Sequence, residues 1–207
     1  HKNSSNQWCI TRNGAEEVWW DIGDEKDITL LDGETITLQI YDFLHDDKPD
    51  GTKVPLTIGV KHLMASTEKM NDTDTNVGGW EKSQMRTVTL PGIFQKLPST
   101  LRAMICEVSK KTFAGNGSYD IVKTVDKLFL LSVVETGAKY DGVYLSEGTK
   151  YPVLAYRDDR VKMKRNGEGG VWTWWLRSPY VENSTKFYSI SYSGDLSDDL
   201  ADRKNGV

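Results

Sequence analysis

Four aspartates and a histidine between residues 42 and 51 are the groups in this sequence best suited to hold a metal ion. The carboxylates are those of Asp42, Asp46, Asp47 and Asp50, with His45 among them and Gly51 after them. Carboxylate-rich loops can bind Ca²⁺. The spacing differs from the twelve-residue EF-hand loop, because no Glu occupies the last position. We therefore expect a solvated turn and no cofactor, with Ca²⁺ at these four aspartates as the alternative.

Residues for covalent or acid–base catalysis are scarce. Cys106 and His45 could form a thiol–imidazole pair, but Cys106 falls within an amphipathic stripe, where a packed thiol is the simpler interpretation. Glycan hydrolysis would need two converging carboxylates. Adjacent side chains of an extended chain diverge, which disfavours the neighbouring acidic pairs, Asp46 with Asp47 and Asp198 with Asp199. The sequence therefore predicts that the protein is not an enzyme.

Tryptophan is unusually frequent, with seven residues in a chain of 207. Three of them fall in residues 172–175, where side chains on a strand would alternate between two faces. Large aromatic side chains dominate the energetics of cores. We expect a tryptophan-rich scaffold with two arginines in it. Its predicted members are Trp80, Arg86, Trp172, Trp174, Trp175 and Arg177.

The segment 178–202 has the composition of a recognition surface. It is rich in Tyr, Ser, Asn and Asp; Tyr gives rigid contact area, and Ser and Asn give adaptable hydrogen bonds. Ordinary polar loops over a core are the competing interpretation. We expect exposed ligand-binding side chains here. They are Tyr180, Glu182, Asn183, Tyr188, Tyr192 and Asp195.

The elements that must position these residues follow from periodicity and turn signals. Residues 27–42 alternate about an Asp-Gly turn and predict a hairpin, with a third strand at 54–60. The i, i+3, i+4, i+7 spacing of apolar residues predicts the best helix over 99–111, with Ser99 as its N-cap. Further strands are expected at 127–134, 171–177 and 187–192, and short helices at 61–70 and 79–86. This order of strands, helices and strands indicates a single α+β domain.

Composition excludes several classes of protein. The net charge of −4 gives no electrostatic basis for binding nucleic acid. The longest largely apolar run, residues 128–134, is far too short for a membrane helix. Cys9 and Cys106 fit no metal or redox spacing. Two separate buried thiols are the simpler interpretation, and a disulfide between them stays open.

Several motifs, taken together, resemble the domain-of-unknown-function family 6273, found in gut bacteria and their phages. The resemblance covers about residues 24–207, and its most specific part is the Trp-Trp-Leu-Arg-Ser-Pro run. In chain order the motifs are Asp42-Phe-Leu-His-Asp46, Gly78-Gly-Trp80, Ser83-Gln-Met-Arg86, Leu97-Pro98, Asp126-Lys-Leu-Phe-Leu-Leu-Ser132 with Glu135, and Trp174-Trp-Leu-Arg-Ser-Pro179.

This pattern is in turn similar to C-type-lectin-like domains, including the formylglycine-generating enzyme group and variable receptor-binding proteins. The resemblance implies a C-type-lectin-like domain over 25–207 with mixed antiparallel sheets, two or three short helices and long irregular loops. Residues 1–24 would be a segment packed on it or leading into it. The family pattern continues past Gly206-Val207, which implies that the last strand is missing here. The related enzymes use cysteines near the C-terminal core, and none follows Cys106.

The resulting expectation is a non-catalytic binding or adhesion module on a bacterial cell surface or a virion. Its partner would be a protein or glycan, with no nucleic acid and no membrane insertion, and the domain would be part of a larger chain or assembly. The alternative is a structural subunit of a virion or cell-surface assembly, whose contacts are to other copies. A glycan-active hydrolase is the third hypothesis.

Overall fold

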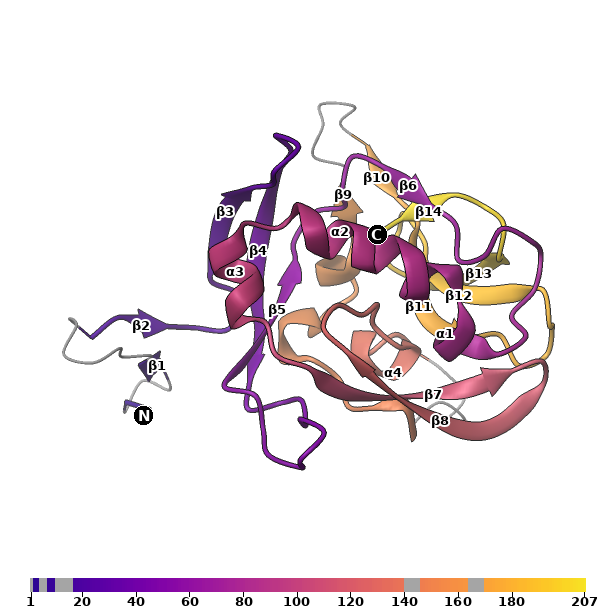
Figure 1. The fold of residues 1–207 in the computed structure, drawn as a ribbon, viewed down its shortest axis with the longest axis horizontal. Helices are drawn as coiled ribbons and strands as arrows, with labels where there is room; N and C mark the ends of the chain where they lie inside the picture. Colours follow the sequence, from indigo (N-terminus) through magenta and orange to yellow (C-terminus); the bar gives the residue numbers. More distant parts are fainter. Residues whose placement is uncertain (1, 4–6, 10–16, 140–145, 164–169) are drawn as a thin grey trace.

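The computed structural model describes residues 2–3, 7–9, 17–139, 146–163 and 170–207 (Figure 1). These residues form a five-stranded sheet, a three-stranded sheet, three two-stranded pairs and several short helices. Figure 1 shows α3 over the three-stranded sheet, α1 beside β11 of the five-stranded sheet, and α2 between them. The α+β expectation, with mixed sheets and short helices, is confirmed.

The predicted N-terminal hairpin is present. Strand β3 (Glu25–Thr29) pairs antiparallel with β4 (Thr35–Phe43), and β4 pairs with β5 (Leu56–Val60). Gly33 has a φ of 91° in the connecting turn, a conformation that glycine adopts without steric cost. The two-residue period of the sequence located this sheet correctly, although burial in β4 does not alternate: Ile36 and Ile40 are buried, and so are their neighbours Thr37 and Tyr41.

The helix expected over 99–111 is wrong beyond its first turns. Helix α3 (Ser99–Met104) has Pro98 rather than Ser99 at its N-cap, and the chain then becomes strand β7 (Val108–Gly115). Strand β8 (Ser118–Asp126) pairs with β7 across a tight turn. Asn116 and Gly117 both have positive φ in this turn, as in the type I′ turns that close hairpins. Pairing with β8 therefore overrides the helical spacing of the apolar residues.

Two further predicted elements are wrong. The expected helix at 61–70 contains only a short strand, β6 (Thr67–Glu68), whose backbone pairs with the C-terminal part of the chain. The expected strand at 127–134 is an irregular connection into helix α4 (Val133–Thr136). Ser132 caps α4, and Glu135 completes a capping box with it. The expected helix at 79–86 is present as α1 (Gly79–Lys82), and a π-helix η1 (Met85–Thr89) and helix α2 (Leu90–Lys96) follow.

The five-stranded sheet has the order β13-β12-β11-β14-β6. Strand β11 (Trp174–Pro179) is its centre and pairs antiparallel with β12 (Lys186–Ile190), which pairs with β13 (Leu196–Leu200). Strand β14 (Asn205–Gly206) lies parallel to β11 and antiparallel to β6. Every residue of β11 is buried, because the sheet is covered on both faces. The strand expected at 187–192 is confirmed as β12, whereas the one expected at 171–177 is interrupted at Thr173 and belongs to the central sheet only from Trp174.

Short elements complete the described chain. At the N-terminal end, the β1–β2 pair stands away from the body in Figure 1, and Trp8 stacks on Phe43 with ring centroids 5.2 Å apart. No helix in the described residues is long and apolar enough to cross a membrane. The remaining elements are β1 (Trp8–Cys9), β2 (Trp19–Trp20), η3 (Pro152–Leu154), η4 (Asp158–Arg160), β9 (Lys162–Met163) and β10 (Val171–Trp172).

The aromatic scaffold agrees with expectation except at one tryptophan. Trp80, Trp174 and Trp175 are buried in the core. Trp172 is 42% exposed, because the chain leaves the sheet at Thr173 and β10 pairs with β9 instead. Cys9 and Cys106 are not joined by a disulfide. Cys9 is buried, but Cys106 follows the end of α3 and is exposed, so the expectation of two buried thiols is wrong for Cys106.

Candidate functional site

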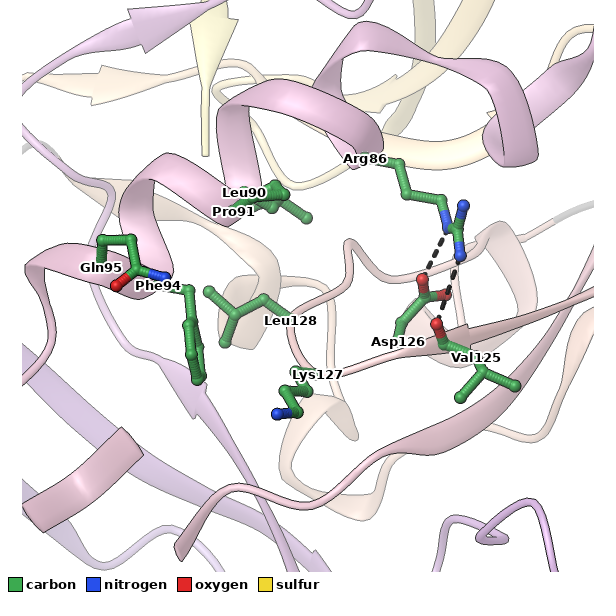
Figure 2. Close-up of a pocket in the computed structure, with 9 residues that line it drawn as sticks. All are labelled: Arg86, Leu90, Pro91, Phe94, Gln95, Val125, Asp126, Lys127 and Leu128. Carbon is green, nitrogen blue, oxygen red and sulfur yellow. Dashed lines mark hydrogen bonds and ion pairs between the residues drawn. The ribbon is translucent and has the colours of Figure 1, made fainter. Parts of the chain in front are cut away.

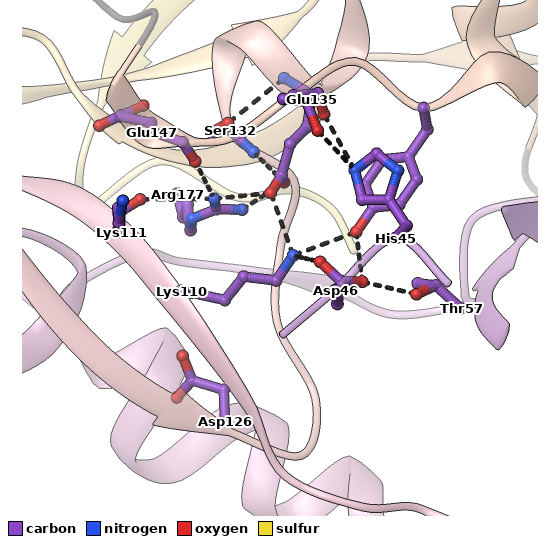
Figure 3. A network of polar contacts seen from close by, with 12 residues as sticks. His45, Asp46, Thr57, Lys110, Lys111, Asp126, Ser132, Glu135, Glu147 and Arg177 are labelled. Carbon is purple, nitrogen blue, oxygen red and sulfur yellow. Dashed lines mark hydrogen bonds and ion pairs between the residues drawn. The ribbon is translucent and has the colours of Figure 1, made fainter. Parts of the chain in front are cut away.

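Charged side chains from distant segments meet in the interior of the domain (Figure 3). The ammonium of Lys110 on β7 donates to Asp46 Oδ1 at 2.6 Å, to Glu135 Oε1 at 3.0 Å and to the Tyr151 hydroxyl at 3.0 Å. The same ammonium lies 3.8 Å from the ring centroid of Phe129. A cation this deeply buried requires such partners, because an unpaired charge in the interior is strongly unfavourable.

Arg177 of β11 is the second cation of this network and is fully buried. Its guanidinium binds both oxygens of Glu135, which sits in the first turn of α4. It also donates to Thr112 Oγ1 at 3.1 Å and to the backbone carbonyl of Glu147 at 2.8 Å. The planar five-donor guanidinium suits this two-pronged contact, so Arg177 joins α4, β7 and the 146–150 segment to the central strand.

The carboxylates of the network have opposite pKa shifts. Burial would raise the pKa of Glu135, but the charges of Arg177 and Lys110 outweigh burial and lower the pKa to about 2. Burial raises the pKa of Glu147 to about 7 despite the charge of Arg177. Glu147 accepts from the Phe113 amide at 2.9 Å and from the Ser178 hydroxyl. Glu135 is therefore a fixed anion, and Glu147 is the group that titrates near neutral pH.

The aspartates expected in one solvated turn have separate partners. Asp46 is buried and also accepts from Thr57 and Tyr151, so the expectation of a solvated turn is wrong for this residue. Asp42 bonds His45, Asp47 pairs with Lys53 at 2.7 Å, and Asp50 caps its own turn through Thr52. Within the described residues, no group of three or more acidic, His or Cys side chains could hold a metal ion.

Asp42, His45 and Thr149 form a carboxylate–imidazole–hydroxyl chain. His45 Nδ1 lies 2.7 Å from Asp42 Oδ2, and His45 Nε2 lies 3.0 Å from Thr149 Oγ1. The ring stacks on Tyr151, with centroids 4.1 Å apart. Leu44, just before His45, has a φ of 52°, which is uncommon for a non-glycine residue. A carboxylate, an imidazole and a hydroxyl in this order are also found where a hydroxyl is activated as a nucleophile. His45 Nε2 contacts the Thr149 backbone carbonyl as well, at 3.2 Å. The three side chains therefore also connect the loop of His45 to the loop of Thr149.

A shallow pocket of about 270 Å³ lies between α2 and the end of β8 (Figure 2). Leu90, Phe94 and Leu128 give it apolar walls. Arg86 closes one end through Asp126, with Nε 2.6 Å from Oδ1. The same carboxylate accepts from the Trp80 indole and Thr124. Arg86 and Trp80 thus belong to the scaffold, as expected.

The residues expected to bind ligand do not share one surface. Tyr180, Glu182 and Asn183 lie in the β11–β12 turn, whereas Tyr192 and Asp195 lie in the β12–β13 turn. The two turns are at opposite ends of β12, roughly 17 Å apart for five residues. Tyr188 is only 6% exposed and packs in the core, so its expected exposure is wrong. Both faces of β12 are covered, and alternation therefore does not bring it to the surface.

Exposed aromatic side chains lie around the β12–β13 turn. Tyr156 is 76% exposed and Tyr192 is 66% exposed. Arg160 Nε donates to the Gly194 carbonyl at 2.8 Å, and the Trp174 indole donates to the Arg160 carbonyl at 2.9 Å. These bonds hold the segments of the two tyrosines against the start of β11. Trp172 on β10 is paired with Lys162, two residues after Arg160. We name this region, consisting of Tyr156, Trp172, Tyr192 and Asp195, the aromatic end.

Sequence comparison places the chain among known families. Residues 51–207 match the family described as Domain of unknown function (DUF6273). The chain belongs to this family. The DUF6273 match begins inside the three-stranded sheet, since β3 and β4 precede residue 51 and β5 follows it. Comparison with curated proteins and with solved structures gives no match.

Several residues that organise this DUF6273 chain were not singled out from the sequence. Lys110 lies in β7, where the apolar spacing predicts a helix, and Tyr151 and Tyr156 belong to no recognisable motif. Asn76 is fully buried and donates to the carbonyls of three residues around the β11–β12 turn. The Ser132-x-x-Glu135 spacing was a detectable sign, because it is the capping-box pattern before α4.

Proposed function

We propose that this DUF6273 domain is a non-catalytic binding or adhesion module that recognises a protein or glycan ligand on a bacterial cell surface or virion. The observation that carries the proposal is the aromatic end. Exposed Tyr and Trp side chains supply large, rigid contact area, and neighbouring polar groups supply hydrogen bonds. The ligand surface first expected over residues 178–202 is thereby narrowed to one of its two turns, with Tyr156 and Trp172 added.

The rigidity of the aromatic end supports this proposal. Gly194 has a φ of 81°, and a Cβ placed there would lie 2.4 Å from the Arg157 carbonyl, so the turn and the η4 segment are in close backbone contact. Asp195 is held by the Ser193 hydroxyl at 2.9 Å. A binding surface formed on ordered segments loses little conformational entropy when a ligand docks.

The placement of the acidic residues favours binding over glycan hydrolysis. Asp46 is buried and bonded on both oxygens. Asp198 pairs with Lys186 at 2.6 Å, and Asp199 accepts from Asn205 at 3.2 Å. A hydrolase needs two carboxylates that converge on an accessible bond, and these carboxylates are engaged within the scaffold. We propose on the same grounds that the mixed sheets and irregular loops are a C-type-lectin-like scaffold for display.

Binding to glycan and protein arrays tests the proposal. The purified chain is applied beside a triple variant, Tyr156→Ala with Trp172→Ala and Tyr192→Ala. We expect the variant to lose at least tenfold in affinity for any ligand found, with an unchanged circular dichroism spectrum. The matched control is Leu31→Ala, which removes an exposed apolar side chain in the β3–β4 turn, outside the aromatic end. Equal binding by the triple variant, or loss by the control alone, would refute the aromatic end as the binding surface.

A further inference from the structure

Strand β8 is an edge strand with apolar side chains on its exposed face. Within the described residues it pairs only with β7, and Figure 1 shows β8 along the lower margin of the domain. Tyr119 is 58% exposed and Ile121 is 38% exposed. Edge strands present unpaired N–H and C=O groups and are templates for pairing with another chain, unless they are blocked.

The direction of the free backbone groups follows from Arg86. Its Nη2 donates to the Val125 carbonyl at 3.2 Å, from the side opposite to β7. Backbone groups in an antiparallel strand alternate between its two edges. The N–H and C=O of Lys123 and Ile121 therefore point to the same outer edge as those of Val125. Arg86 covers the edge at Val125, whereas no other residue that the structure describes hydrogen-bonds the outer backbone groups of Lys123 and Ile121.

We propose that a second copy of this chain pairs with β8 through an antiparallel, two-fold symmetric contact centred on Ile121. Two-fold interfaces are self-complementary, so each residue must suit its own symmetry partner. In this register Ile121 faces Ile121 of the other copy, and Lys123 faces the segment 119–120, where the register of β8 against β7 shifts, on both sides of the axis. The two Ile121 side chains meet on the axis, and each Lys123 ammonium meets a segment that carries the exposed ring of Tyr119, a favourable pair.

Neighbouring symmetric registers suit the strand less well. If the two-fold axis passed through Lys123, the two Lys123 ammonium groups would oppose each other. Ile121 would then face Val125, whose carbonyl is already bound by Arg86. A centre at Val122 also directs Tyr119 to Val125. Like charges directly opposite each other destabilise a strand pair. The charge pattern and Arg86 thus select the register centred on Ile121 for the pairing of two copies.

This contact leaves the aromatic end free, because β8 and the β9–β10 region lie on opposite sides of the domain in Figure 1. A symmetric pair would present two aromatic ends. Multivalent presentation strengthens binding to a surface that carries many ligands, without any new contact. The dimer is proposed on the geometry of β8 alone and does not depend on the ligand.

Analytical ultracentrifugation of the purified chain is the first test. We expect a concentration-dependent dimer, and Ile121→Lys should be monomeric because it would oppose two lysines on the axis. The control is Ile58→Lys, which makes the same change at an exposed isoleucine of β5 and should leave the dimer intact. A monomer at all concentrations, or a dimer that survives Ile121→Lys, would overturn the proposal; circular dichroism verifies that each variant is folded.

Disulfide trapping tests the register. All variants carry Cys106→Ser, because Cys106 is an exposed free thiol. Residues opposite each other at a hydrogen-bonded pair have Cα atoms about 5.5 Å apart, within disulfide range. Ile121→Cys should therefore cross-link to itself under oxidation. Tyr119→Cys should not, but a mixture of Tyr119→Cys and Lys123→Cys should. A dimer without the Ile121 cross-link would place the contact elsewhere and reject this register.

Discussion

The guanidinium of Arg177 holds both carboxylate oxygens of Glu135, through Nη1 at 2.5 Å and Nη2 at 2.9 Å. The pair links the centre of the five-stranded sheet to the capping box of α4. Both side chains are excluded from solvent. Such a pair adds little net stability over apolar residues of similar shape, but breaking one half leaves an uncompensated buried charge.

We therefore expect Arg177→Met to lower the free energy of unfolding by about 3–5 kcal/mol. Urea denaturation followed by tryptophan fluorescence measures this. Arg157→Met is the control, because that arginine is mostly exposed beside Asp158 and its loss should change stability by less than about 0.5 kcal/mol. Similar values for the two variants would show that the buried pair does not hold the sheet to α4.

Glu147 predicts a pH dependence of stability. Its pKa is about 7 in the folded protein, above the ordinary 4.5. Protonation therefore favours the folded state: this contribution is fully present below about pH 4.5 and is lost as the pH rises through 7. Glu147→Gln should remove that loss and gain on the order of 3 kcal/mol at pH 8 relative to the unmodified chain. Unfolding midpoints measured between pH 5 and pH 8 test this.

The control for this pH series is Glu107→Gln, at an exposed position, which should leave the pH profile unchanged. Glu135 acts in the opposite direction. Its pKa is lowered to about 2, so its contribution is present above about pH 4.5 and is lost as the pH falls through 2. The two carboxylates together predict that stability is greatest above the pH range in which Glu135 is protonated and below the range in which Glu147 loses its proton. A steady rise in stability from pH 5 to pH 8 would contradict the assignment to Glu147.

Asn76 anchors the β11–β12 turn. Its amide donates to the carbonyls of Tyr180, Asn183 and Lys186, at 3.0, 2.9 and 2.8 Å. Asn76→Ala should cost about 3 kcal/mol, because buried acceptors lose their donor. Hydrogen exchange should increase first in residues 180–186. Asn76→Asp keeps the oxygen that accepts from the Asn116 amide but removes the amide donors. An equal loss of stability in both variants would therefore assign the effect to the amide donors. Full stability in Asn76→Ala would contradict the role of Asn76 as an anchor.

Two glycines should respond in opposite ways to alanine. Gly115 has a φ of 78°, and a Cβ there would lie 2.0 Å from the Asn76 carbonyl oxygen. Gly115→Ala should therefore cost at least about 2 kcal/mol. Gly92 lies in α2 with open space around it, so Gly92→Ala should stabilise by about 0.5–1 kcal/mol. Thermal unfolding of both variants checks the signs, and a neutral Gly115→Ala would mean that the β7–β8 turn can move away from Asn76.

Local signals predicted the parts of the fold that depend on local physics. The 25–43 hairpin follows from alternation and an Asp-Gly turn, and β11 follows from its aromatic run. The helix predicted over 99–111 is wrong because the apolar spacing fits a helix up to Val108. The strand that pairs with this region, β8, follows only after the Asn116-Gly117 turn. That dipeptide was visible in the sequence and is a strong hairpin signal.

The candidate sites were less predictable. The alternation of side chains along β12 predicts its two faces, but it does not show that both faces are covered. For this reason the sequence predicts an exposed Tyr188. The Lys110 network joins side chains that are far apart in sequence, such as Asp46 and Tyr151. A single sequence contains no signal for such pairings. The aromatic end likewise depends on the contact between Arg160 and Gly194, which is tertiary.

The position of β14 has a consequence for biosynthesis. Strand β6 joins the five-stranded sheet only through β14, since Glu68 pairs with Asn205 and Thr67 with Gly206. The ribosome makes β6 long before β14, so the backbone of β6 has to wait for its partner while translation continues. Contacts between such distant segments form slowly. The nascent chain would thus keep an incomplete central sheet until Asn205 and Gly206 have left the exit tunnel, and during that period the edge of β6 would be exposed to aggregation.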